Sequence, residues 1–196
     1  MRTRDADKEA LVKQKAVELL VSNGFEGFST NKLAKLCNMS VATLYIYYKD
    51  KDDLIVQIGR EEVHKMKQAV SKGFLAELSL EEGLRIQWKN RYQYLINNAL
   101  IGPFFEQLRT SSYQDLIYSG FRDDEGDQLS QFVDQVIARG EVKPMPMEVF
   151  WSATFAPLNT LIRAHHEGQR ATGKPFTLTE PILWQAFDLV LNGLKN

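Results

Sequence analysis

Apolar residues recur at helical spacing along almost the whole chain, and this periodicity limits the fold more than any other feature. Over residues 8–23, for example, one helix face carries Val12, Ala16, Leu19 and Leu20. Gly24 follows this segment and suits a left-handed C-terminal cap. No stretch of useful length alternates as a β-strand does, and 196 residues suffice for one large domain or two small ones. The sequence therefore predicts an all-α fold.

Capping signals predict two short helices after the first one. The earlier of the two is expected over residues 30–37, with Ser29 or Thr30 as its N-cap. Asn38 suits the tight turn that follows, because asparagine tolerates a positive φ, and Ser40 is the predicted N-cap of the next helix. Two short helices joined by such a turn and packed under a preceding helix form a helix-turn-helix arrangement.

The third predicted helix, over about residues 41–47, has two different faces. At about 100° per residue, Tyr48 lies about 40° and Val41 about 60° from Leu44, so these three face inward. The inward set is completed by Leu33, Ala34 and Met39. The opposite face, about 160° from Leu44, carries Ala42 and Ile46, flanked by Thr43 and Tyr45. That face suits DNA, because apolar groups contact thymine methyls and hydroxyls donate to phosphates. An ordinary amphipathic helix pair in a bundle is the alternative.

The charge distribution agrees with an N-terminal segment that meets a polyanion. Residues 1–51 carry nine Lys and Arg against six Asp and Glu, although the whole chain has a net charge of −1. Lys49 and Lys51 are expected at the rim of the predicted DNA-binding face, where they would approach phosphates. An imbalance of three charges also arises by chance, so the charge supports the motif without deciding its function.

A more specific pattern spans residues 8–55. A Thr-Leu-Tyr core at residues 43–45 is followed by the aromatic pair Tyr47-Tyr48 and then by Lys51. Other parts of the pattern are Ala16, Leu20, Gly24, Phe25, residues 29–34, residues 39–42, Leu54 and Ile55. With these residues the segment resembles the DNA-binding domain of the tetracycline-repressor (TetR) family of bacterial transcription regulators. The chain departs from that family at Asn38, usually glycine, and at Val41-Ala42, where relatives often carry a polar or basic residue.

The resemblance implies a residue set for double-stranded DNA. Phosphate contacts are implied for Thr30, Thr43, Tyr45, Tyr47 and Lys51, and base-edge contacts for Val41, Ala42 and Ile46. The complete predicted set is Thr30, Asn31, Ser40, Val41, Ala42, Thr43, Tyr45, Ile46, Tyr47, Lys49 and Lys51. The resemblance also implies an N-terminal three-helix DNA-binding domain over residues 1–50. A larger helical domain for ligand binding and dimerisation would follow over residues 51–196.

The predicted helices after residue 51 are longer. One opens on a capping box formed by Ser79 and Glu82, and residues 111–127 show only a weak pattern. Two long helices, over residues 147–167 and about 179–194, are apolar on more than one face and are separated by a polar loop at 168–175. A helix that is apolar on several sides needs more than one neighbour. In the similar family these last two helices pair with those of a second copy, so a homodimer is expected.

The helices of this second domain are rich in aromatic residues. The pattern is typical of ordinary core packing, whereas the family resemblance favours a pocket for a small-molecule effector. The predicted lining is Trp88, Tyr92, Phe104, Phe105, Phe121, Trp151, Phe155 and Asn159. Few charged residues fall on these apolar faces, so we expect an uncharged or hydrophobic ligand.

Other chemical sites receive little support from the sequence. Neighbouring side chains on a helix point about 100° apart, so His165 and His166 are not expected to share a metal ion. Cys37 is expected to be buried and inert, and no catalytic residue or cofactor motif is identified. The charged N-terminus lacks an apolar signal segment, and no apolar run approaches the roughly 20 residues of a membrane span, so a cytoplasmic protein is expected.

The predicted function is that of a homodimeric transcriptional regulator, a repressor, on a pseudo-palindromic operator and modulated by a small ligand. One alternative is a DNA-binding or architectural protein that does not respond to a ligand. The other is an α-helical enzyme that uses the aromatic cavity.

Overall fold

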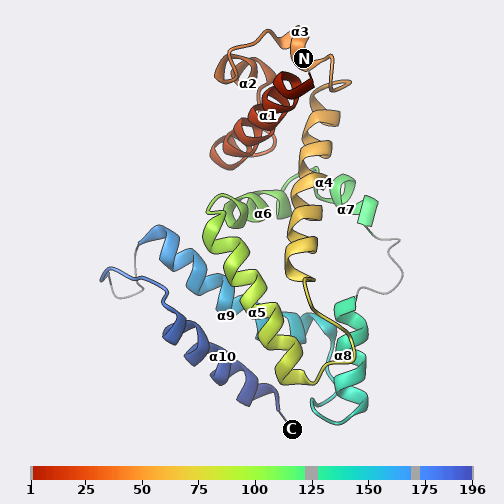
Figure 1. The fold of residues 1–196 in the computed structure, drawn as a ribbon, viewed down its shortest axis with the longest axis vertical. Helices are drawn as coiled ribbons and strands as arrows, with labels where there is room; N and C mark the ends of the chain where they lie inside the picture. The colour runs from red at the N-terminus through yellow and green to blue at the C-terminus, as the bar shows by residue number, and fades with distance from the viewer. Residues whose placement is uncertain (1, 122–127, 169–172, 196) are drawn as a thin grey trace. The chain divides into compact units, whose positions relative to one another are not determined.

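The computed structural model describes residues 2–121, 128–168 and 173–195, and their regular structure is helical apart from isolated β-bridge residues at Val142, Pro175 and Lys195. The helices in chain order are α1 (Arg2–Asn23), α2 (Thr30–Leu36), α3 (Val41–Leu44), α4 (Lys51–Val70), α5 (Leu80–Asn97), α6 (Ile101–Arg109), α7 (Gln114–Tyr118), the 3₁₀ turn η1 (Ser119–Phe121), α8 (Gln128–Ala138), α9 (Met147–Glu167) and α10 (Glu180–Leu194) (Figure 1). The predicted all-α fold is confirmed. Within the described ranges, no helix combines the length and apolar character required to cross a bilayer.

Several helix ends follow the predicted capping chemistry. Ser29 caps α2 by accepting from the Lys32 N–H, and Ser40 caps α3 in the same way. Gly24 and Asn38 adopt positive φ values of 72° and 52° after α1 and α2. The capping box at the start of α5 is also formed, since side chain and backbone bond reciprocally there. The turns that delimit the helix-turn-helix are therefore dictated locally.

Two segments differ from expectation. The third helix is regular only to Leu44, and the chain continues as tight turns in which the Ile46 N–H donates to Thr43 and the Tyr47 N–H to Leu44. Part of the weakly patterned region 111–127 is helical, because α7 and η1 form there, although five residues are too few for a readable periodicity. Residues 122–127 of that region, and residues 169–172 of the predicted loop 168–175, lie outside the described residues.

The chain divides into two compact units, and each unit consists of two separate segments of the sequence. The first contains Met1–Lys65 and Leu100–Asp123, and the second contains Met66–Ala99 and Asp124–Asn196. Helix α4 contributes residues to both. These units are defined by packing, whereas the predicted boundary after residue 50 was drawn from the sequence motif.

The core of the first unit joins the helix-turn-helix to α6. Helix α1 packs against α2 and α6, and α2 packs against α3. The rings of Phe25 and Phe104 have centroids 5.5 Å apart, and a Cβ atom at Gly59 would overlap the side chain of Ile117. Each large buried side chain contributes about 1.5–3 kcal/mol relative to exposure. The fully buried set includes Leu20, Leu33, Leu44, Leu54 and Ile55.

The core of the second unit is formed by α5, α9 and α10, which pack against one another in all three pairs (Figure 1). The rings of Trp88 and Phe187 meet edge to face, with centroids 5.4 Å apart. At Gly83 a Cβ atom would overlap the ring of Phe132, so the absence of a side chain lets the ring lie against the α5 backbone.

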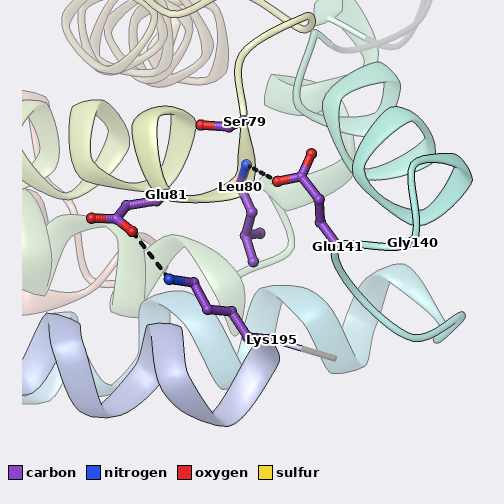
Figure 2. A pocket seen from close by; sticks show the side chains of 6 residues that line it. All are labelled: Ser79, Leu80, Glu81, Gly140, Glu141 and Lys195. Carbon is purple, nitrogen blue, oxygen red and sulfur yellow. Dashed lines mark hydrogen bonds and ion pairs between the residues drawn. The ribbon is translucent and has the colours of Figure 1, made fainter.

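An open pocket of the second unit lies at the start of α5 (Figure 2). Its polar groups bond to one another: the Leu80 N–H donates to Glu141 at 2.7 Å, and Lys195 forms an ion pair with Glu81 at 3.1 Å. An antiparallel bridge between Val142 and Lys195 adjoins them. These contacts tie the end of the chain to the start of α5, which is a structural role.

Candidate nucleic-acid interface

The inner face of the helix-turn-helix is a small apolar core, as predicted. Leu44 and Tyr48 are buried against Leu33 and Ala34 of α2, and all four belong to the main cluster of the first unit. Met39 and Val41 are half-buried and pack on this cluster. Leu44 and Tyr48 therefore fix the rotation of α3, and with it the residues that face away from the protein.

The outer face carries apolar and aromatic groups in contact with solvent. Ile46 is 75% exposed, Tyr45 and Tyr47 are more than 40% exposed, and Ala42 is exposed. Full burial of an isoleucine side chain stabilises a fold by about 1.5–3 kcal/mol. Because Ile46 is mostly exposed, the fold gains little of this stabilisation from it. Single exposed apolar residues are common on proteins, but Tyr45, Ile46 and Tyr47 are adjacent and lie in the tight turns directly after α3, next to the buried Leu44. A face of this composition fits contact with another molecule.

Hydroxyl groups border this face. The Ser40 and Thr43 hydroxyls are 2.8 Å apart, and Ser40 also caps α3 by accepting from the Thr43 N–H at 3.1 Å. The Tyr45 hydroxyl donates to Thr30 of α2 over 3.5 Å, at the long limit of a hydrogen bond. Helices α2 and α3 thus present hydroxyl groups side by side. Hydroxyl groups in such an arrangement can donate hydrogen bonds to phosphate oxygens.

The cations of the predicted set lie at the entry to α4. Lys49 is exposed and Lys51 is half-buried, while Asn31 is exposed on α2. The backbone N–H of Lys49 donates to Asp53 at 2.8 Å, and the Asp53 N–H donates to Asp50 at 2.8 Å. Hydrogen bonds from Gln57 and from the Lys49 backbone lower the pKa of Asp53. Asp50 and Asp53 thus accept hydrogen bonds from the backbone of the same segment that carries Lys49 and Lys51.

The predicted ligand residues divide between the two units. Phe104, Phe105 and Phe121 belong to, or pack on, the hydrophobic cluster of the first unit. In the second unit, Trp88 and Phe155 are buried, Tyr92 is half-buried, and Trp151 and Asn159 are exposed. The structure therefore does not gather the whole predicted set into one compact unit.

Sequence reasoning missed Arg91, which lies beside the aromatic group of the second unit. Gln87 and Arg91 are both buried on α5, within the same stripe as Trp88. The available signal was their spacing, because residues 84, 87, 88, 91 and 95 follow the three- and four-residue intervals of one helix face. The charge of Arg91 concealed that signal.

The histidine pair near the end of α9 has packing partners. His165 Nδ1 accepts from the Leu178 N–H at 3.2 Å, and His166 Nε2 lies 3.0 Å from the Leu95 carbonyl oxygen. Among the described residues, no group of three or more His, Cys, Asp or Glu side chains is placed to hold a metal ion. Cys37 is buried, and burial raises the pKa of its thiol, as expected for an inert packing residue.

Comparisons with known proteins agree with this geometry. The sequence profile of the family described as "Bacterial regulatory proteins, tetR family" matches residues 12–58, which contain the helix-turn-helix. An uncharacterized HTH-type transcriptional regulator of Haemophilus influenzae is 29% identical over 101 residues, covering 52% of this chain and 54% of that protein. The chain thus matches about half the length of the curated relatives.

Solved structures extend the likeness over the full length. A TetR family transcription regulator from Marinobacter aquaeolei is 26% identical with a TM-score of 0.82, and the match covers 100% of both chains. The transcriptional regulator FadR from Bacillus subtilis, solved in complex with stearoyl-CoA, is 16% identical with a TM-score of 0.69 over 95% of this chain and 99% of that one, a likeness of fold alone. Residues 12–58, with the helix-turn-helix, thus match the tetR family of bacterial regulatory proteins, and the whole chain is similar to a solved TetR family transcription regulator.

Proposed function

We propose that this protein is a homodimeric transcriptional repressor that binds a pseudo-palindromic operator in double-stranded DNA and responds to a small-molecule effector. The observation that carries the proposal is the exposed surface of α3 and the turns after it, where Ile46 is 75% exposed although Leu44 is buried. The proposal implies a cytoplasmic protein, because operator DNA lies in the bacterial cytoplasm.

The composition of the outer face supports separate sets of residues for base contacts and for phosphate contacts. Ile46, with Ala42 and Val41, would contact base edges, above all thymine methyl groups. Hydroxyl and ammonium groups would hold the backbone and set the position of α3 in the major groove; they are Thr30, Thr43, Tyr45, Tyr47, Lys49 and Lys51, with Asn31 and Ser40 beside them. Specificity would then come from few residues and affinity from many.

The last two helices support a twofold dimer. An outward stripe of α9 carries small or apolar residues that permit close helix approach: Val149, Ala153, Ala156 and Thr160. On α10, Leu189 is 72% exposed, among outward residues that are mostly polar. A twofold axis through these helices would present two α3 helices to half-sites about 34–36 Å apart.

The second unit supports an effector site. Its α5, α9 and α10 enclose aromatic side chains, and a protein of the same fold, FadR of Bacillus subtilis, was solved with stearoyl-CoA. An effector that binds one conformation more tightly than another would shift the population of dimers able to span the operator. We propose that binding of the effector releases the operator.

Selection of genomic DNA fragments by the purified protein tests the proposal. A palindromic motif is expected for the wild type, and Ile46→Ala is expected to relax one or two positions in each half. Leu116→Ala, at a residue that is also exposed but lies on α7, is the matched control and is expected to select the wild-type motif. Binding of all fragments alike at moderate salt would refute the proposed operator.

A further inference from the structure

The segment proposed to face the DNA bases has no charged or carboxamide side chain. Residues 40–48 contain no Arg, Lys, Asn, Gln, Asp or Glu, which are the residue types that best tell one base from another by hydrogen bonds. Ala42 and Ile46 are exposed there, and Ile46 is 75% exposed. These two side chains offer a base only carbon and hydrogen atoms.

The local backbone holds Ile46 in this exposed position. Leu44 is fully buried, and the Ile46 N–H donates to the Thr43 carbonyl at 3.3 Å. The following N–H, that of Tyr47, donates to the Leu44 carbonyl at 3.0 Å. Because isoleucine is branched at Cβ, its χ1 angle is also restricted. The turn therefore presents the apolar side chain before any DNA is bound.

Hydroxyls are the only polar side-chain groups of residues 40–48. Ser40 Oγ accepts from the Thr43 N–H at 3.1 Å and lies 2.8 Å from Thr43 Oγ1, and the Tyr45 hydroxyl donates to Thr30 over 3.5 Å. A hydroxyl both donates and accepts, so it can bond either to a carbonyl oxygen or to an amino group of a base. These hydroxyls therefore do not distinguish a base that has an oxygen at one position from a base that has an amino group there.

Thymine and 5-methylcytosine differ little at the edge that such a segment would meet. Both carry a methyl group on C5, which lies in the major groove. They differ at position 4, where thymine has an oxygen that accepts and cytosine has an amino group that donates. An aliphatic side chain packs against the methyl group and has no atom that responds to position 4. Unmethylated cytosine offers no methyl group to contact.

We propose that this regulator recognises the C5-methyl group and not thymine as such, so that its ligands include DNA methylated at C5 of cytosine. At a position read by Ile46, 5-methylcytosine paired with guanine takes the place of thymine paired with adenine. Methylation of a cytosine at that position strengthens the binding of the regulator. The inference rests on the proposed operator function and names the chemical group that the operator presents.

Four versions of the operator test the inference on the full-length protein. One position of a half-site carries thymine or uracil opposite adenine, or else 5-methylcytosine or cytosine opposite guanine, and each thymine of the operator is tested in this way. The two members of each pair differ by one methyl group, so the opposite base does not affect the ratio of their dissociation constants. Fluorescence anisotropy titrations at one fixed salt concentration measure the four constants.

The wild type is expected to gain about fivefold in affinity from the methyl group in both pairs, as the removal of one methyl group from water predicts. A gain for thymine over uracil without a gain for 5-methylcytosine over cytosine would mean that position 4 is read, and would overturn the inference. The absence of a methyl effect at every thymine of the operator would overturn it as well.

Variants of residue 46 assign the methyl effect to its side chain. Ile46→Ala is expected to bind both members of each pair alike, whereas Ile46→Val, which keeps the branch at Cβ, retains most of the effect. Asn31→Ala, at an exposed residue of α2, is the control and keeps the wild-type ratios whatever its own affinity. A fivefold ratio that persists in Ile46→Ala contradicts the proposal. If Ile46→Ala does not fold, as judged by circular dichroism, the wild-type ratios still decide the question.

Selection from two DNA pools separates this inference from the proposed function. One pool of genomic fragments contains cytosine, and the other is amplified with 5-methylcytosine in its place. We expect both pools to yield the operator, and the second to yield additional sites in which 5-methylcytosine replaces the thymine. If both pools yield the same sites and cytosine methylation gives no gain in affinity, the inference is wrong and the DNA-binding function stands. If neither pool yields a site, the proposed function is wrong and the inference fails with it.

Discussion

The Tyr113 hydroxyl donates a 2.5 Å hydrogen bond to Asp52, which joins the turn after α6 to the first turn of α4. The Tyr113 ring also lies 5.9 Å from the ring of Phe25, just after α1. Burial and the carboxylate of Asp52 raise the pKa of Tyr113, so the phenol remains a donor at any physiological pH. Through this residue, a segment distant in sequence supports the base of the helix-turn-helix.

Replacing Tyr113 with Phe is expected to lower the free energy of unfolding by about 1 kcal/mol. The ring contacts persist in Tyr113→Phe, and Asp52 is exposed and regains water, so the net loss is that of one hydrogen bond. Urea denaturation measures this loss. Tyr47→Phe, which changes an exposed hydroxyl, is the control and is expected to alter stability by less than about 0.5 kcal/mol. An equal loss in both variants would mean that the Asp52 bond contributes nothing.

Glu26 is expected to contribute stability that depends on pH. It accepts hydrogen bonds from the Ser112 backbone N–H at 2.9 Å and from the Ser112 hydroxyl at 3.1 Å, and bonds to backbone N–H groups, that of Ser112 first, lower its pKa below the ordinary 4.5. A carboxylate with a lowered pKa stabilises the fold above pH 4.5 and loses that contribution as the pH falls through its folded-state pKa.

The variant Glu26→Gln tests this contribution. At pH 7 it is expected to be less stable than the wild type by less than about 1 kcal/mol, because Glu26 is exposed and screened by solvent. The difference should shrink as the pH is lowered below 4.5, which a series of urea denaturations at different pH values measures. A difference that stays constant with pH would show that the charge of Glu26 is not involved.

Local chemistry made much of the fold predictable. Ser29, Ser40 and Gly24 end or begin helices because a hydroxyl accepts from orphan N–H groups and glycine adopts positive φ without cost. The helical spacing of apolar residues over 147–167 gave the bounds of α9 directly. The exposed position of Ile46 followed from helix geometry once Leu44 was assigned to the inside.

Other features of the structure depend on tertiary contacts that the sequence does not display. Aromatic residues of α6 and α9 look alike in the sequence, yet Phe104 packs against Phe25 in the first unit and Phe155 belongs to the second. Arg91 looks like a surface residue until Trp151 and Phe155 are found against its guanidinium. No local pattern encodes which helix becomes the neighbour of another.

Tyr45 and Ile46 are expected to act differently on DNA. Tyr45→Ala removes a phosphate contact and is expected to weaken binding to all sites by about 1 kcal/mol, roughly fivefold. Ile46→Ala is expected to affect mainly the preference at one base pair. Binding titrations on the operator and on variants with single base changes distinguish the two. A uniform loss in both variants would show that Ile46 does not read a base.

Leu189 is expected to be essential for dimerisation. It is 72% exposed on α10, and Leu189→Asp would place a charge in the proposed interface without disturbing the core. Sedimentation velocity is expected to detect a dimer for the wild type and a monomer for the variant. Leu75→Asp, at a residue that is 56% exposed outside α9 and α10, is the control and should remain a dimer. A dimer in both variants would place the interface elsewhere.

The most direct test of base reading by α3 removes a single methyl group from the DNA. Each thymine of the selected operator is replaced in turn by uracil, which lacks only the C5-methyl, and the affinity is measured for the wild type and for Ile46→Ala. We expect at least one position per half-site where uracil weakens the wild type by about 1 kcal/mol, and no effect at that position in Ile46→Ala. If no thymine matters, or if the same loss persists in Ile46→Ala, the exposed isoleucine does not read the operator.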